Sequence, residues 1–256
     1  MTVESNFERF WETTLSPTTQ ASVIKHWREH ELTAVLRGNT VVMHLQDFSS
    51  VAGLQILDVG CGYGGVSIAL ALAGASVVGT DFDAQRLEGA KIRVHEDHPG
   101  SNVRLVRSAG ESLPFADNSF DVVVCNDVLE HVQSHDSTLA GIARVLRPGG
   151  WLYIQFPNRF SPENLKKDPH YGLRGVSILP PWAGRLYVVR LRRRSPSYDV
   201  GTFPVAGKVL QVLHALGIET IQYWPSPRRT LGWLTPALRA YRLNTVPIIT
   251  AIGRKS

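Results

Sequence analysis

The first segment that could do chemistry is a glycine-rich turn, DVGCGYGG, at residues 58–65. It follows a short apolar run at 54–59 and precedes a second apolar run at 66–73. We expect the first run to be a strand and the second a helix. Glycine has no Cβ, which permits a tight turn and close approach of a ligand to the backbone. Gly60, Gly62 and Gly65 satisfy the spacing G-x-G-x-x-G of dinucleotide-binding turns. The turn therefore predicts a ligand site.

Asp81 is the second candidate, 21 residues after Gly60 and at the end of the next apolar run. A carboxylate at this place can accept hydrogen bonds from both hydroxyls of a ribose. The neighbouring Asp83 directly precedes a helical pattern and is the better candidate for a helix N-cap. The turn and the acid together fit two cofactors equally, NAD and S-adenosylmethionine (SAM).

Three further segments separate these cofactors: LPFADNSFD at 113–121, NDVLEHV at 126–132 and LRPGG at 146–150. A short-chain dehydrogenase would carry a Tyr-x-x-x-Lys pair, and no tyrosine here has a lysine four residues on. Together with LDVGCG at 57–62, the segments resemble the class I SAM-dependent methyltransferases. The branch most resembled is the ubiquinone/menaquinone-biosynthesis type of small-molecule methyltransferase. The resemblance covers residues 54–156 well and the remainder loosely.

The resemblance implies a cofactor site for SAM. Asp58, Gly60 and Gly62 match the motif whose backbone and carboxylate hold the methionine part of SAM. Asp81 matches the ribose-binding acid and Phe82 the apolar residue beside adenine. The other implied contacts are Cys61, Gly64, Ala109, Gly110, Glu111 and Asn126.

The expected contacts at residues 109–111 and at Asn126 rest on different matches to the family. Many relatives have Asp-Ala-Glu where this chain has Ala109-Gly110-Glu111, so the aspartate that contacts the adenine amine is missing. Backbone groups at Ala109 and Gly110 are expected to serve instead. Asn126 matches the position at the end of the fourth strand that faces the cofactor.

Residues for the methyl acceptor are sought near the same strand ends. Methyl transfer from a sulfonium is an in-line displacement, and positioning alone can supply up to roughly 7–11 kcal/mol. A base is needed only if the nucleophile loses a proton. His131, just after the fourth strand, is the candidate base, and a structural histidine that bonds a loop is the alternative. His170, Tyr171 and Arg159 are candidate acceptor contacts, with ordinary surface polar groups as the alternative.

The elements that must position these residues alternate between strand and helix from residue 54 on. This predicts parallel pairing through right-handed crossovers, and hence an α/β, doubly wound, mostly parallel seven-stranded sheet with helices on both faces. Residues 6–36 predict two helices. Strands are expected at 54–59, 76–80, 103–106, 120–125, 151–156, 218–224 and 246–252, and helices at 66–73, 84–96, 138–146 and 205–216.

One domain is expected over residues 1–256. Residues 1–50 would form an N-terminal helical lid and 54–156 the SAM-binding core. Residues 157–203, rich in Pro, Gly and Arg, break the α/β rhythm and form an insertion after strand five. A segment of this length is expected to be structured and to serve the acceptor side. Residues 204–256 would add a helix and strands that complete the sheet.

The net charge of +5 conceals two unlike parts. Residues 1–156 carry 11 Lys and Arg against 18 Asp and Glu, whereas 157–256 carry 16 against 4. A basic part suits an anionic substrate, a membrane surface or nucleic acid, and a merely solvated face is the alternative. Because LYVVRLRRR at 186–194 mixes apolar and basic residues, a transient contact with anionic membranes is expected through 185–194.

Other classes of protein are disfavoured. No apolar stretch reaches the about 18 residues of a spanning helix, and the N-terminus lacks the pattern of a secretory signal. Cys61 and Cys125 lie in apolar surroundings, which predicts buried thiols in a reducing compartment. No Cys/His spacing indicates a metal site. The expected location is cytoplasmic, peripheral to the membrane.

The function expected is methyl transfer from SAM to a small molecule, at an oxygen, with a lipid-like or anionic acceptor. One alternative is an RNA or other nucleic-acid methyltransferase, suggested by the basic part. Against it, CNDV at 125–128 is not the Asn-Pro-Pro-Tyr-like motif of base N-methylators, and Cys125 lacks the Pro-Cys context of a cytosine C5 nucleophile. The other alternative is a protein that binds SAM without turnover.

Overall fold

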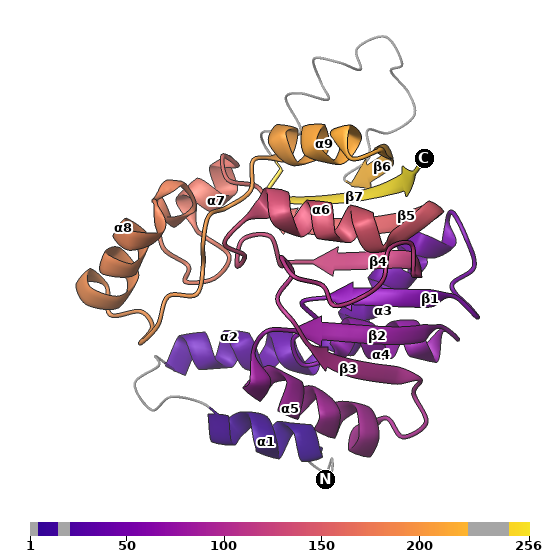
Figure 1. Ribbon diagram of the computed structural model, residues 1–256. Helices are drawn as coiled ribbons and strands as arrows, with labels where there is room; N and C mark the ends of the chain where they lie inside the picture. Colours follow the sequence, from indigo (N-terminus) through magenta and orange to yellow (C-terminus); the bar gives the residue numbers. More distant parts are fainter. Residues whose placement is uncertain (1–4, 15–20, 225–245) are drawn as a thin grey trace.

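A seven-stranded sheet runs through the described chain, which comprises residues 5–14, 21–224 and 246–256 of the computed structural model. Its strands are β1 (Gln55–Val59), β2 (Ser76–Asp81), β3 (Val103–Arg107), β4 (Phe120–Asn126), β5 (Leu146–Pro157), β6 (Ile218–Trp224) and β7 (Ile248–Lys255). They lie in the order β3-β2-β1-β4-β5-β7-β6 (Figure 1). Strands β1 to β5 pair in parallel, and β7 runs antiparallel between β5 and β6. The predicted mostly parallel sheet is confirmed.

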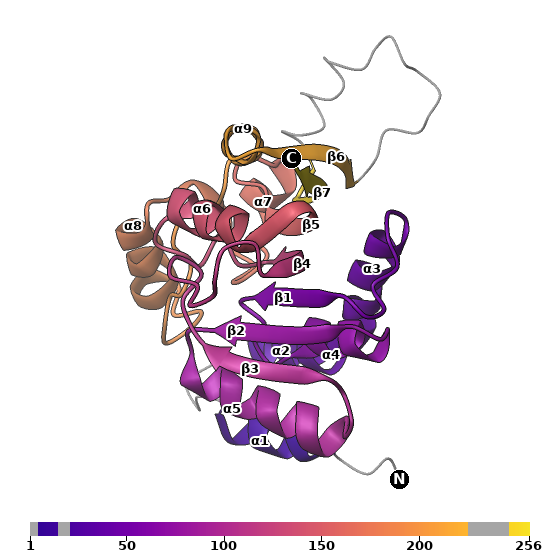
Figure 2. The ribbon, with the colours of Figure 1, turned by 45° about the vertical axis from the view of Figure 1, so that its right-hand side comes forward.

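Helices cover both faces of this sheet. One face carries α3 (Ala34–Gln46), α4 (Gly65–Leu72) and α5 (Ala84–Ile92), which continues as the π-helix η1 (Arg93–Asp97). The other carries α6 (His135–Val145) and α9 (Ala206–Ala215). Figure 2 shows α6 and α3 on opposite sides of the sheet. No helix in the described part of the chain is both long and apolar enough to cross a membrane.

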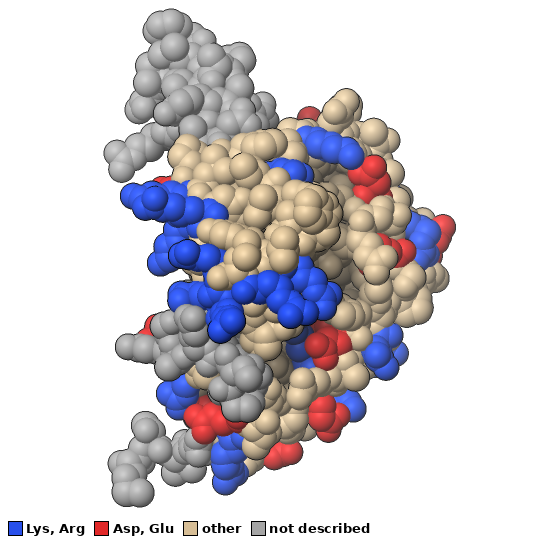
Figure 3. All heavy atoms as spheres, turned by 90° about the vertical axis from the view of Figure 1, so that its left-hand side faces the viewer, with Lys and Arg blue, Asp and Glu red and all other residues tan. Residues whose placement is uncertain are grey.

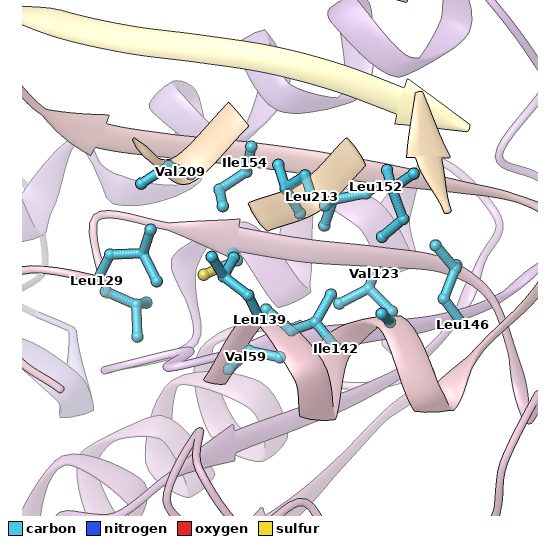
Figure 4. Close-up of a cluster of buried hydrophobic side chains, with 14 of the residues drawn as sticks. Val59, Val123, Leu129, Leu139, Ile142, Leu146, Leu152, Ile154, Val209 and Leu213 are labelled. Carbon is cyan, nitrogen blue, oxygen red and sulfur yellow. The ribbon is translucent and has the colours of Figure 1, made fainter. Parts of the chain in front are cut away.

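The core has two layers because the central strands are buried on both faces. In β4, Val123 and Cys125 pack on one side, while Val122 and Val124 pack on the other. This two-sided burial explains the continuous apolar run of that strand. In Figure 4, Leu139 and Ile142 of α6 and Val209 and Leu213 of α9 close over the sheet, together with Val59, Val123, Leu129, Leu146, Leu152 and Ile154.

The N-terminal region holds three helices instead of the two predicted over residues 6–36. They are α1 (Asn6–Thr14), α2 (Ala21–Leu32) and α3, which begins at Ala34 and extends to Gln46. The buried face of α3 includes Ala34 and Gly38. Such small residues leave a weak apolar signal in the sequence, although they allow the closest packing between helices.

The insertion is structured, as predicted. It contains α7 (Pro162–Lys166), the 3-10 helix η2 (Val176–Ile178), α8 (Pro181–Arg185) and the π-helix η3 (Leu186–Leu191). It has a small core of its own, formed by Tyr171, Leu173, Val176, Val188, Val200 and Phe203. In Figure 1 it lies beyond the arrowheads of the parallel strands, at the carboxyl edge of the sheet where α/β proteins bind ligands.

Two glycines let α3 lie directly against α4. A Cβ added at Gly38 would lie 2.7 Å from Ala69 Cβ and 3.0 Å from the carbonyl oxygen of Gly65. A Cβ at Gly65 would lie 2.5 Å from Ala34 Cβ. The two helices therefore touch through atoms that have no room for another methyl group.

Gly38→Ala is expected to lower the free energy of unfolding by about 1–3 kcal/mol, because the added methyl group overpacks this contact. Urea and thermal unfolding measure it. The matched control is Gly207→Ala in α9, where a Cβ meets no atom within 4 Å. That variant is expected to be neutral or more stable by about 0.4–1 kcal/mol. Equal losses in both variants would contradict the close packing.

Candidate cofactor and active site

The register of the sheet gathers the predicted cofactor residues at one edge. In the parallel ladders Val59 pairs with Thr80 of β2 and with Cys125 of β4. The residues that follow these three positions are the glycine turn, Asp81 and Asn126. Parallel pairing therefore brings three motifs that are far apart in the sequence to neighbouring strand ends.

The glycine turn has the backbone that its sequence predicts. Gly60, Gly62 and Gly64 have φ angles of 68°, 54° and 81°, in the left-handed region that favours glycine. A Cβ at Gly60 would lie 2.4 Å from a methyl carbon of Val128, whereas one at Gly62 would meet no atom within 4 Å. Gly60 is thus required by packing, and Gly62 borders an open cradle that a ligand can enter.

Asp81 connects this turn to the end of β2. Its side chain is 4% exposed. One carboxylate oxygen accepts the N–H of Gly62 at 3.0 Å and the other accepts the N–H of Asp83 at 2.9 Å. Each oxygen keeps a lone pair for a further donor, as two ribose hydroxyls would require. Asp83 caps α5 by accepting from the N–H groups of Gln85 and Arg86, so the predicted N-cap is confirmed.

Asp58 and Cys61 belong to the turn, and both side chains are buried. The Asp58 carboxylate is buried and accepts the Ser67 hydroxyl at 2.6 Å. Burial raises the pKa of Asp58 to about 7, the Ser67 hydrogen bond opposes this shift and the nearby Asp81 adds to it. A cation close by would favour the ionised form. Burial likewise raises the pKa of the Cys61 thiol. The main-chain N–H of Cys61 donates to Thr80 O at 2.8 Å.

The positions expected around adenine differ in character. Phe82 is 58% exposed, which leaves an apolar ring available beside the turn. Ala109 and Gly110 are half-buried. The Glu111 carboxylate accepts the N–H of Gln133 at 2.7 Å and that of Ser134 at 3.4 Å, so it holds the loop after β4. Its contact with the cofactor stays a prediction.

Arg37 is a residue that the sequence analysis missed. It lies on α3, one residue before the glycine that packs against α4, and its Nε is buried without a hydrogen-bond partner among the described residues. Another guanidinium nitrogen donates to His30 O at 2.8 Å. A buried N–H without a partner calls for an acceptor, and the carboxylate of the methionine part of SAM has the matching charge. No local pattern marks this arginine in the sequence.

A second unexpected feature is a polar chain across the ends of β4, β5 and β7. Asp127 accepts from Asn126 Nδ2 at 3.0 Å and from Gln155 Nε2 at 3.2 and 3.0 Å. Gln155 Oε1 accepts the Thr250 hydroxyl at 2.9 Å, which fixes the orientation of the amide. Asp127 has a φ of 57°, an uncommon conformation for a residue other than glycine. The amide of Asn126 is therefore held by its neighbour at the predicted cofactor edge.

The candidate catalytic histidines meet at a buried carboxylate. Glu130 Oε1 lies 4.0 Å from His131 Nε2 and 3.7 Å from His170 Nε2, and the two rings are 5.1 Å apart. Burial raises the pKa of Glu130 and lowers that of His170, which favours the neutral form of both groups. Donor atoms of the three residues lie within 4.8 Å of one another, close enough to hold a metal ion. No local pattern in the sequence marks this grouping, because the insertion brings His170 from a distant segment.

The other two acceptor-side candidates make structural contacts. The Tyr171 hydroxyl donates to Asp199 Oδ1 at 2.6 Å, and its side chain is 3% exposed. A guanidinium nitrogen of Arg159 donates to Ile178 O at 3.2 Å within the insertion. His131 keeps a ring nitrogen, Nε2, for which no hydrogen bond is formed within the described chain. The buried Nδ1 of His170 and Nε of Arg159 likewise have no partner among the described residues.

Comparisons with known proteins show the family of the chain. A family model described as a methyltransferase domain matches residues 57–154. The chain is 32% identical over 194 residues to a ubiquinone biosynthesis O-methyltransferase of Thiobacillus denitrificans, which covers 76% of this chain and 74% of that protein. The protein of the same name from Aromatoleum aromaticum is 36% identical over 175 residues, 68% of each chain. Some other relatives of that name match over only about half of their own length.

Solved structures support the same fold. The magnesium protoporphyrin IX methyltransferase of Synechocystis PCC 6803, solved with bound SAH, superposes with a TM-score of 0.58 at 18% identity, over 88% of this chain and 84% of that one. The chain belongs to the class I SAM-dependent methyltransferase family, in the branch that resembles the ubiquinone-biosynthesis enzymes. It is a SAM-dependent small-molecule methyltransferase, and SAM is its cofactor.

The residues of the site fit SAM. The cradle at Gly62, the spare lone pairs of Asp81 and the unpartnered Nε of Arg37 are suited to the methionine part, the ribose and the carboxylate of the cofactor, respectively. Bound SAM supplies an electrophilic methyl group on a sulfonium. The protein residues hold and orient it.

Asp81→Ala is expected to weaken SAM binding by at least about tenfold, because two ribose hydroxyls lose a charged acceptor worth about 1.5–3 kcal/mol per hydrogen bond. Isothermal titration with SAM and S-adenosylhomocysteine measures the change, and thermal unfolding confirms that the variant folds. The control Asp83→Ala removes the N-cap of α5, which costs about 1 kcal/mol of stability, and should keep the SAM affinity. Unchanged affinity in a folded Asp81→Ala protein would contradict the assignment.

Proposed function

We propose that the protein transfers the methyl group of SAM to a hydroxyl oxygen of a small acceptor that is lipid-like or anionic. The observation that carries this proposal is the position of His131, which lies just beyond β4 at the cofactor edge with Nε2 available as a proton acceptor. The names of the relatives, which are O-methyltransferases, support an oxygen acceptor.

The reaction asks three things of the protein. The acceptor oxygen must be held in line with the methyl group, its proton must be taken up and water must be kept away. In the proposed mechanism His131 Nε2 takes the hydroxyl proton as the oxygen attacks. The neutral Glu130 and His170 surround that imidazole without supplying a competing strong base.

We place the acceptor between the N-terminal helices and the insertion. Figure 1 shows α2 and α8 on the side of the molecule to which the parallel strands point. Within the insertion, Phe160 and Trp182 have exposed rings, whereas Trp11 of α1 is buried. The aromatic surface available for an acceptor thus comes from the insertion more than from α1.

His131→Ala is expected to lower kcat by about 10²–10⁴-fold, the range for loss of a general base, and to leave SAM affinity unchanged. A methyl-acceptor screen read by mass spectrometry identifies the acceptor, and steady-state kinetics then measure the loss. The matched control is His135→Ala, at the first residue of α6, where the histidine Nε2 lies 3.0 Å from Thr202 O. Full turnover by His131→Ala would mean that proximity alone supplies the rate.

We further propose that the enzyme is cytoplasmic and that the basic face of its insertion draws it transiently to anionic membranes or to an anionic acceptor. Figure 3 shows Lys and Arg gathered on the face that carries α8. Charged and apolar side chains coincide there around a hollow of about 640 Å³, lined by Trp182, Arg185, Leu186, Val189, Arg190, Arg193 and Pro196. Near an anionic leaflet each basic residue adds about 1 kcal/mol, an effect that fades with salt.

Replacing Arg185, Arg190, Arg192 and Arg193 by glutamine is expected to abolish salt-sensitive co-sedimentation with anionic vesicles and to leave SAM binding intact. Arg194 stays unchanged because its Nε donates to Tyr171 O at 2.9 Å. A control variant loses four exposed charges elsewhere, at Arg9, Lys91, Arg104 and Lys208. The membrane proposal fails if the wild-type protein ignores anionic vesicles at low salt. A salt-dependent Michaelis constant, lost in the same variant, would instead indicate an anionic soluble acceptor.

A further inference from the structure

Asp199 lies where three parts of the molecule meet: the insertion, the loop after β4 and the start of α5. Its main-chain oxygen is 3.0 Å from His131 Nδ1. One carboxylate oxygen accepts the Tyr171 hydroxyl at 2.6 Å, and the other lies 3.5 Å from a guanidinium nitrogen of Arg86.

The contact with the main-chain oxygen fixes the tautomer of His131. A carbonyl oxygen has no proton to donate, so Nδ1 must carry the hydrogen of this bond. In the neutral imidazole the lone pair is then on Nε2. The tautomer that the proposed mechanism requires is therefore set by Asp199 rather than by any side chain that faces His131 Nε2.

Buried contacts set the orientation of the Asp199 carbonyl in turn. The Tyr171 hydroxyl donates to the carboxylate and also accepts the main-chain N–H of Asp199 at 3.1 Å, so one side chain holds the residue at two points. Further along, Gly201 N–H donates to Glu130 O. Residues 199–202 thus run along the loop that carries His131.

Arg86 connects Asp199 to the elements that carry the predicted cofactor residues. It lies in the first turn of α5, just after Asp83, the N-cap that also donates its N–H to Asp81. Because the Arg86–Asp199 pair is substantially exposed, solvent screens it and it contributes little to stability. The pair matters because of its position: it lies between Asp81 and the loop that carries His131.

We propose that Asp199 is a positioning residue for methyl transfer, which holds His131 in the Nδ1–H tautomer with Nε2 as the proton acceptor. Tyr171 anchors it, and Arg86 ties it to the helix beside Asp81. The proposal rests on the proposed role of His131. It also gives the buried Tyr171 hydroxyl a function that does not require contact with the acceptor.

Nitrogen NMR of protein labelled with ¹⁵N-histidine tests the tautomer without any turnover. The wild-type His131 signals, assigned by their loss in His131→Gln, are expected to show the Nδ1–H form. Asp199→Ala and Tyr171→Phe are expected to show the Nε2–H form or a mixture. The control Tyr198→Phe removes a hydroxyl that has no partner among the described residues, next to Tyr171, and should keep the wild-type signals. An Nε2–H wild type, or an unchanged tautomer in both variants, would overturn the proposal.

Kinetics supply the second readout. Tyr171→Phe is the milder substitution and protects the test against a variant that fails to fold. It and Asp199→Ala are each expected to lower kcat about tenfold or more, within the range for a misplaced base, at unchanged KM for SAM. In a His131→Ala background neither should cause further loss, because residues that act as one unit are not additive. Losses that multiply in that background would indicate a merely structural role and overturn the proposal.

The two proposals fail in different ways. Full turnover by His131→Ala would overturn both the base and the positioning role. A large loss in His131→Ala, with wild-type turnover in Tyr171→Phe and Asp199→Ala, would overturn the positioning role alone.

Discussion

The structure depends on one carboxylate, that of Asp81, which accepts main-chain N–H groups from Gly62 and Asp83. The first bond fixes the glycine turn after β1 against the end of β2, and the second places the residue that caps α5. Both elements are thereby set relative to the same strand end. A charged acceptor with two backbone donors is a strong and directional contact, and it leaves the outer lone pairs of Asp81 turned toward the cofactor edge.

Small residues provide the second constraint. Because Gly38 and Gly65 have no side chains, α3 lies directly on the first turn of α4, and Arg37 is the residue that precedes this contact. If Arg37 binds the cofactor carboxylate as we infer, its position follows from backbone packing rather than from a binding motif. The same contact explains why the face of α3 toward the sheet looks unremarkable in sequence.

In the proposed function, the insertion supplies the acceptor side. Its own small core holds Tyr171 and Phe203 in place, and this core carries His170 to Glu130 and Asp199 to His131. The same segment carries Asp199 and the basic surface, since the arginines at 190–194 precede Asp199 by only a few residues.

The sequence alone determined the alternating strands and helices, the glycine turn, the place of Asp81 at the end of the second strand and the N-cap at Asp83. Each of these is encoded by residues within one turn or one strand, where periodicity and turn chemistry act locally. Only the tertiary structure showed α3, Arg37, the polar chain through Asp127 and Gln155, and the meeting of Glu130 with His170. Those features join segments tens of residues apart, or depend on how closely two backbones approach. Such contacts are decided by packing geometry, which local sequence patterns do not contain.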